Sequence, residues 1–148
     1  MKTVPMLMLA SLLALPAFAH DDATLDKAKS PNGGQLRMAG AYHLELVVAK
    51  DNAEAREGPV LIYLTDHAEN KIAAKGMSAT VTLLAGKMKS SATLLPDGDN
   101  RLKGSAKYVS DPNMKAVVTL KRPDGGTEQA RFTPLARMPV GGAAHAGH

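Results

Sequence analysis

The chain has 148 residues, with 18 Lys and Arg against 14 Asp and Glu, five His and no Cys. This length fits one domain, and the absence of cysteine excludes disulfides, thiolate metal ligands and cysteine catalysis. Basic and acidic residues are interspersed along the chain without a basic stripe, so we expect no nucleic-acid partner.

Residues 1–19 predict a secretory signal peptide. Lys2 supplies a positive start, residues 4–15 form an apolar run, and Ala17 and Ala19 place small residues at a cleavage site. The run is shorter than the roughly 20 apolar residues of a membrane span, and no later segment is longer, so we expect no stable membrane insertion. These features predict a periplasmic protein whose mature chain begins at His20.

Residues 20–34 are polar and end in a Ser-Pro-Asn-Gly-Gly sequence, which predicts a flexible arm with a short helical turn within residues 23–29. From residue 35 the pattern changes to short runs separated by turns rich in Pro, Gly, Asp and Asn. Residues 42–48 alternate and residues 60–65 form a β-branched and apolar run, as strands do. Further strands are expected at residues 35–38, 78–84, 89–95, 101–108, 115–121 and 128–133.

Seven or eight short strands without a long amphipathic helix predict an all-β fold, an antiparallel immunoglobulin-like β-sandwich over residues 35–135. Its core should come from alternating apolar positions: Leu44, Leu46, Val48, Leu61, Tyr63, Val81, Leu83, Leu94, Val118, Leu120 and Phe132. Residues 136–148 are rich in Gly and Ala and contain two histidines, which predicts a disordered tail.

Histidines near the two ends are the first candidate metal ligands. Cleavage before His20 would expose an α-amine beside an imidazole, a pair of nitrogen donors that suits copper(II). His145 and His148 lie three residues apart in the tail and could wrap an ion. The alternative is that all three are solvated side chains.

A second group of candidates lies in or beside the strands. His43 and Glu45 are two residues apart on one strand and therefore share a face. His67 directly follows Asp66, and neighbouring strands through residues 43 and 67 would bring the two histidines together. The alternative for each is a hydrogen-bonded surface histidine.

Signals for catalysis are absent from the sequence. The chain contains no G-x-S-x-G nucleophile elbow, no H-E-x-x-H zinc motif and no phosphate-binding glycine loop. We therefore expect no enzyme.

Several segments together resemble small periplasmic proteins of bacterial heavy-metal resistance and efflux systems, and a domain attached to the periplasmic adaptors of cation efflux pumps. The similar segments are residues 33–35, 41–47, 62–67, 78–84, 100–102 and 130–132. Such proteins often carry His before the Gly-Gly pair, where this chain has Asn32. A looser likeness, to periplasmic copper carriers, would match His20 with the Asp66-His67 pair.

These observations together predict a periplasmic protein that binds a divalent transition metal and buffers it or delivers it to an efflux system. Copper is the first choice, with zinc or nickel as alternatives, and the resemblance implies a periplasmic efflux adaptor as partner. The predicted ligands are His20, His43, His67, His145 and His148, with Glu45 and Asp66 as carboxylate partners. The alternative is a module without metal that docks an adaptor or envelope protein, for example by adding a strand at a sheet edge.

Overall fold

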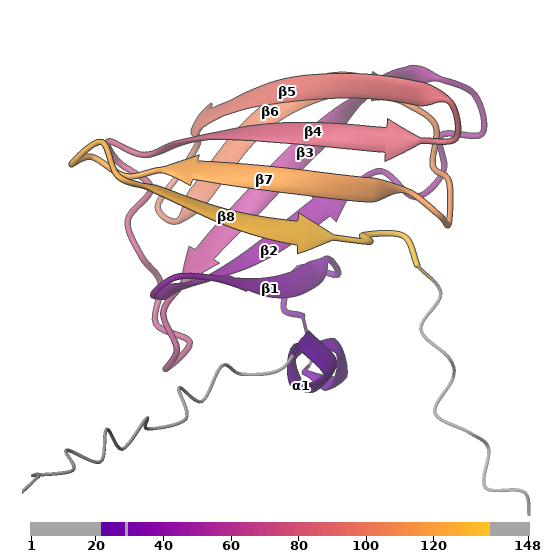
Figure 1. The fold of residues 1–148 in the computed structure, drawn as a ribbon. Coiled ribbons are helices and arrows are strands. Elements are labelled where there is room, and N and C mark those ends of the chain that lie inside the picture. The colour runs from indigo at the N-terminus through magenta and orange to yellow at the C-terminus, as the bar shows by residue number, and fades with distance from the viewer. Residues whose placement is uncertain (1–21, 29, 137–148) are drawn as a thin grey trace, which may run out of the picture.

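The computed structural model describes residues 22–28 and 30–136, which are almost entirely β-structure (Figure 1). The predicted signal peptide, His20, and the tail with His145 and His148 lie outside the described residues. The elements are α1 (Asp22–Lys27), β1 (Gln35–Ala39), β2 (Tyr42–Val48), β3 (Arg56–Thr65), β4 (Ser78–Ala85), β5 (Met88–Pro96), β6 (Arg101–Tyr108), β7 (Lys115–Lys121) and β8 (Thr127–Phe132).

All paired strands are antiparallel and follow the order β1-β2-β3-β6-β5-β4-β7-β8. The predicted antiparallel all-β fold is therefore confirmed, with eight strands. The sheet folds over on itself between β5 and β6, which share only the pairs Leu95–Lys103 and Pro96–Leu102. Figure 1 shows β4, β7 and β8 in front of β2 and β3, so the curved sheet encloses the core between two layers. Within residues 22–28 and 30–136, no helix is long and apolar enough to cross a membrane.

The two edges of the sheet are joined by side chains. The Gln35 amide nitrogen donates to the Thr133 hydroxyl over 3.2 Å, and the Thr133 backbone N–H donates to the Gln35 side-chain oxygen over 2.7 Å. These bonds link the start of β1 to the residue after β8. The first and last strands are thereby held side by side.

Two hairpins show how local sequence fixes the register. Ala39 pairs with Tyr42 and Ala85 with Met88, so each turn has two residues. The first turn residue is Gly in both cases, with φ of 59°. Two-residue hairpins favour this left-handed backbone, which glycine adopts without steric cost.

The interior is filled by the alternating apolar residues of the strands. The largest fully buried side chains are Tyr108, Leu44, Leu46, Ile62, Leu64, Leu83, Leu94, Leu102, Met114, Leu120, Val60 and Val81. The prediction that Leu61 and Tyr63 belong to this core was wrong, because both are only half-buried. In β3 the inward residues are Val60, Ile62 and Leu64, and a run that is apolar at every position does not reveal which alternate set faces inward.

A buried tyrosine crosslinks backbone segments at one end of the molecule. The Tyr108 hydroxyl donates to the Pro59 carbonyl over 2.6 Å and accepts from the Ala49 N–H over 2.8 Å. The adjacent Ser110 hydroxyl donates to the Ala49 carbonyl and accepts from the Asn52 N–H. Burial raises the pKa of the Tyr108 phenol, since the charged form would lose its hydration.

The short helix packs against the first strand, beneath the sheet in Figure 1. Leu25 is buried, and Asp26 accepts from the Arg37 guanidinium over 2.6 Å. Burial of Leu25 and the Asp26–Arg37 ion pair therefore hold this part of the predicted arm.

Candidate functional site

A groove of about 420 Å³ lies where β2 and β3 meet the segment of residues 30–34. Its walls combine imidazole, carboxylate, amine and amide groups with two apolar side chains. The lining residues are Pro31, Asn32, Leu36, His43, Glu45, Tyr63, Thr65, Glu69, Lys71 and Asn100. Two of the predicted ligands, His43 and Glu45, line this groove, and both belong to β2.

The two strand-associated histidines meet at the edge of this groove. β2 and β3 pair so that His43 lies opposite Thr65, which places His67 two residues further along the chain. Nε2 of His43 and Nδ1 of His67 are 3.0 Å apart, and the ring planes are nearly perpendicular at 85°. The expectation that neighbouring strands would bring His67 close to His43 is confirmed.

Glu45 is buried, with 2% of its surface exposed, and its carboxylate receives the segment of residues 30–34. The N–H groups of Asn32 and Gly34 donate to Oε2 over 2.9 and 2.8 Å, and the Asn32 amide donates to Oε1 over 3.0 Å. Three donors satisfy much of the hydrogen-bonding capacity of a carboxylate that would be costly to bury alone. Glu45 therefore holds residues 30–34 against β2, where they form one wall of the groove.

Asp66 closes the turn that carries His67. Its carboxylate accepts from the N–H groups of Ala68 and Asn70 and from the Asn70 side chain, over 2.8, 2.9 and 3.1 Å. The hydrogen bonds from Asn70 are the main reason that the pKa of Asp66 is lowered, because they stabilise the charged carboxylate. The turn thus fixes the backbone on both sides of His67.

The same turn contains a strained residue. Glu69 has φ of 65°, and among the described residues it is the one non-glycine residue with positive φ. A side chain in this conformation costs about 1–2 kcal/mol relative to the right-handed region. Glu69 also lines the groove, and strained residues concentrate at functional sites.

The described residues supply two imidazoles and no larger ligand cluster. Within residues 22–28 and 30–136, no group of three or more His, Asp or Glu is close enough to hold a metal ion. Of the predicted ligands, His43 and His67 adjoin each other, while Glu45 and Asp66 accept hydrogen bonds from backbone and amide groups. His20, His145 and His148 lie outside the described residues.

The sequence analysis assigned no role in the site to Asn32, Gly34 or Glu69. A cradle of N–H groups around a carboxylate has no sequence motif of its own. The available signal was Glu45 itself, a carboxylate within an apolar strand, which needs hydrogen-bond donors once it is buried. Gly34 permits the contact, because a Cβ at this position would collide with the Leu46 carbonyl.

Comparisons with known proteins provide no relative for this arrangement: no family model, curated protein or solved structure matches the chain.

Proposed function

We propose that this protein binds a divalent transition metal ion through His43 and His67 and buffers it or hands it to an efflux system in the periplasm. Copper(II) is the first choice, with zinc or nickel as alternatives. The observation that carries the proposal is the 3.0 Å separation of the two imidazole nitrogens. The proposed periplasmic setting rests on the resemblance that we inferred from the sequence of residues 33–132.

The separation of the two nitrogens suits two ligands of one ion. With metal–nitrogen bonds of about 2.0–2.1 Å, nitrogens 3.0 Å apart subtend an angle of about 95° at the metal. Adjacent ligands of a square-planar centre lie about 90° apart, and copper(II) and nickel(II) favour that geometry. The two nitrogens now share a hydrogen bond, so binding would require the proton between them to move to the other nitrogen of its ring. Each ring would also turn by about 40°, the angle between the nitrogen–nitrogen line and a metal–nitrogen bond of this length.

A site with two protein imidazoles suits transfer better than permanent retention. Structural metal sites are closed by four protein ligands, whereas open positions admit water or a further ligand. Here the remaining positions could be filled by water or by the terminal histidines His20, His145 and His148. An open site of this kind releases its ion readily to a partner with more ligands.

The test is native mass spectrometry of the purified chain with substoichiometric copper(II), zinc(II) and nickel(II) in competition. We expect one bound equivalent, lost in His43→Ala and in His67→Ala and retained in Thr65→Ala, a groove variant that removes no imidazole. Affinity should fall steeply below about pH 6, because histidine must be neutral to ligate and its ordinary pKa is about 6.5.

The other outcomes decide between the alternatives. Loss of the metal on blocking the N-terminal amine, with His43→Ala unaffected, would assign the site to His20. Loss in a His145→Ala, His148→Ala double variant alone would assign it to the tail. No retained metal at micromolar protein would refute histidine ligation and favour the docking module. Equal affinity at about pH 5.5 and about pH 7.5, one unit either side of the ordinary histidine pKa, would do the same.

A further inference from the structure

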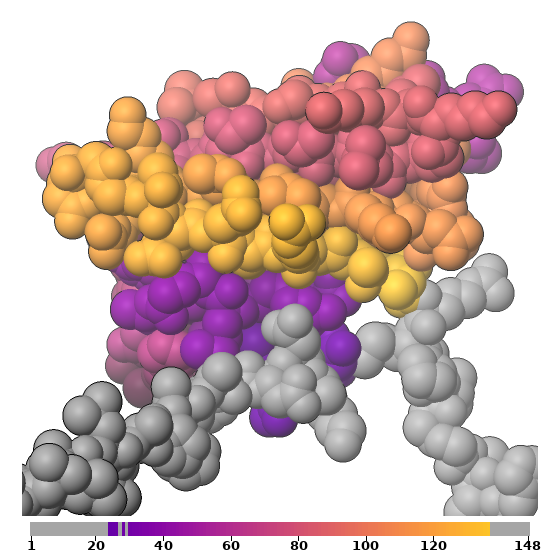
Figure 2. All heavy atoms as spheres, in the orientation of Figure 1, coloured from indigo at the N-terminus to yellow at the C-terminus, as the bar shows by residue number. Residues whose placement is uncertain are grey.

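The outer face of β5, β4, β7 and β8 carries charge of one sign. Its side chains come from the alternate positions that point away from the core, and its charged members are Lys89, Lys115, Lys121 and Arg131, all exposed. Figure 1 shows β4, β7 and β8 side by side at the front of the molecule, and Figure 2 shows the same face as an open surface. We call this surface the cationic face.

No carboxylate in these four strands neutralises the cationic face. Their single acidic residue, Glu128, pairs in register with the buried Leu120, so it lies on the inner side, where Arg122 approaches it to 3.5 Å. Within the part of the chain that the structure describes, the four cations make no ion pair. The other acidic residues between Lys89 and Arg131 in the sequence lie in the connections between strands: Asp97, Asp99, Asp111 and Asp124.

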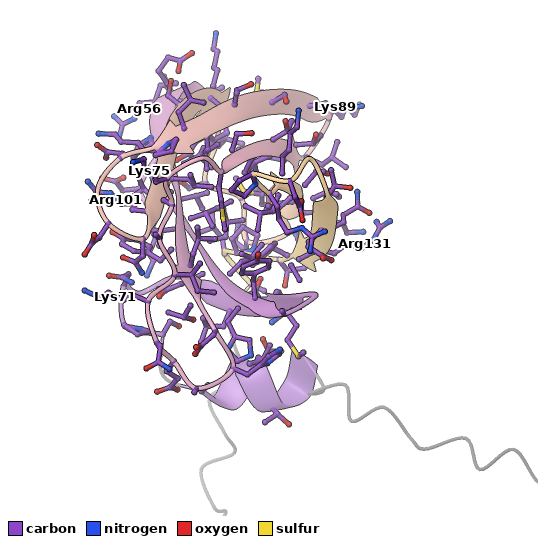
Figure 3. The ribbon with its side chains drawn as sticks, turned by 90° about the vertical axis from the view of Figure 1, so that its left-hand side faces the viewer. Arg56, Lys71, Lys75, Lys89, Arg101 and Arg131 are labelled. Carbon is purple, nitrogen blue, oxygen red and sulfur yellow. The ribbon has the colours of Figure 1, made fainter. Side chains whose placement is uncertain are left out.

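Two of the cations flank an exposed leucine, and a third lines the same hollow. Leu84 is 42% exposed and lies opposite Lys89 on one side and Lys115 on the other. Arg131 pairs with Val117 on the adjoining row, and a shallow hollow of about 310 Å³ runs over Leu84, Lys115, Val117 and Arg131. Figure 3 shows Lys89 and Arg131 on the same side of the molecule, away from Lys71 and Lys75.

We propose that the cationic face docks on a lipid surface that carries anionic phospholipid headgroups. Charge complementarity favours an anionic partner, since each Lys or Arg near such a surface is attracted by its negative potential. The exposed Leu84, and the 59% exposed Leu95 on the same face, suit the apolar boundary beneath the headgroups. Single-stranded nucleic acid fits less well, because the cationic face has no aromatic side chain on which a base could stack.

The area of the face allows several headgroups to bind together. Four strands spaced about 4.8 Å apart span about 14 Å, and seven residues along a strand span about 23 Å. Lys89 and Lys115 are separated by two strand spacings, which is about 10 Å. Binding would thus be the sum of several weak contacts, as is usual for peripheral attachment. This inference does not depend on the proposed metal site, which uses other residues.

The test is co-sedimentation of the full chain with vesicles of phosphatidylcholine alone and with about 30 mol% phosphatidylglycerol. We expect binding to the anionic vesicles that disappears at about 0.5 M salt, where screening is strong. A Lys115→Glu, Arg131→Glu double variant should lower the partition coefficient at least about tenfold. Leu84→Ser should lower it with no change of charge.

The matched control is a Lys50→Glu, Lys75→Glu double variant, which changes net charge equally at exposed positions outside the cationic face. Its loss should be several-fold smaller. Equal loss in both double variants, equal binding of the wild type to both vesicles, or no binding to anionic vesicles would overturn the proposal. If the protein bound a polyglutamate column but not the vesicles, an acidic protein would become the expected partner in place of a lipid surface. If the charge-reversed variant fails to fold by circular dichroism, Lys115→Ala, Arg131→Ala replaces it in the same comparison.

Discussion

The anchoring of residues 30–34 by Glu45 leads to the sharpest stability prediction. In Glu45→Ala, the N–H groups of Asn32 and Gly34 lose the acceptor that they reach over 2.9 and 2.8 Å. A fully buried donor left without a partner costs about 1–3 kcal/mol. Because Gly34 is half-buried and Asn32 is exposed, about 2–6 kcal/mol is an upper bound for the two together. Because a surface segment can move towards water, we expect the lower part of that range, a loss of about 2–4 kcal/mol in unfolding free energy.

Urea unfolding measures this loss, and amide hydrogen exchange locates it. The N–H groups of Asn32 and Gly34 should exchange faster in Glu45→Ala, while amides of the core strands should change only with global stability. Glu45→Gln retains an oxygen for both N–H groups, so it should lose no more than about half as much. Glu57→Ala, an exposed glutamate of β3, is the control and should stay within about 0.5 kcal/mol. A loss below about 1 kcal/mol in Glu45→Ala, or unchanged exchange at Asn32 and Gly34, would refute the reasoning.

Three further predictions concern single residues. Tyr108→Phe leaves the Ala49 N–H and the Pro59 carbonyl unpaired and should cost about 1–3 kcal/mol in thermal unfolding. Because the pKa of Tyr108 is raised in the folded protein, the stability that its phenol contributes is complete below pH 10.0, the ordinary pKa of tyrosine. That stability is lost as the pH rises from 10.0 through the folded pKa. Parallel plots of stability against pH for wild type and variant above pH 10.0 would contradict this. Glu69→Gly should raise the unfolding free energy by about 0.5–1 kcal/mol in urea, since glycine relieves the positive φ but gains freedom in the unfolded chain; a loss would show that the Glu69 side chain stabilises the turn. The pKa of Asp66, measured by carbon-detected NMR, should lie below 3.8, the ordinary value for aspartate. The stability that Asp66 contributes is present above pH 3.8 and is lost as the pH falls through the folded pKa. A titration midpoint at or above pH 3.8 would argue against the hydrogen bonds from Asn70.

Strand positions were largely readable from the sequence. The predicted strands at residues 42–48, 101–108 and 115–121 match β2, β6 and β7 in both bounds. Alternation and turn residues act locally, so they report the presence of a strand without its neighbours. For β3, which is apolar on both faces, the same local signal did not show that Val60, Ile62 and Leu64 face inward instead of Leu61 and Tyr63.

The candidate site was only partly predictable. The sequence placed His43 and Glu45 on one face and His67 after Asp66, but their meeting depended on β2 pairing with β3 in the observed register. Burial of Glu45 depended on residues 30–34 folding over it, a contact across 11 to 13 residues. Periodicity carries no information about such a contact.

The sequence by itself determined the all-β class, most strand bounds and the identity of the candidate ligands, because side-chain alternation and turn chemistry depend on neighbouring residues. Only the tertiary structure decided the strand order, the 3.0 Å approach of two histidines and the gathering of four cations on one face. In the sequence these cations form no stripe, because acidic residues lie between Lys89 and Lys115 and between Lys121 and Arg131. The fold separates the two signs, because Glu128 faces inward and the other acidic residues of this segment lie between strands, while alternate strand positions carry Lys and Arg to the outer face of β5, β4, β7 and β8.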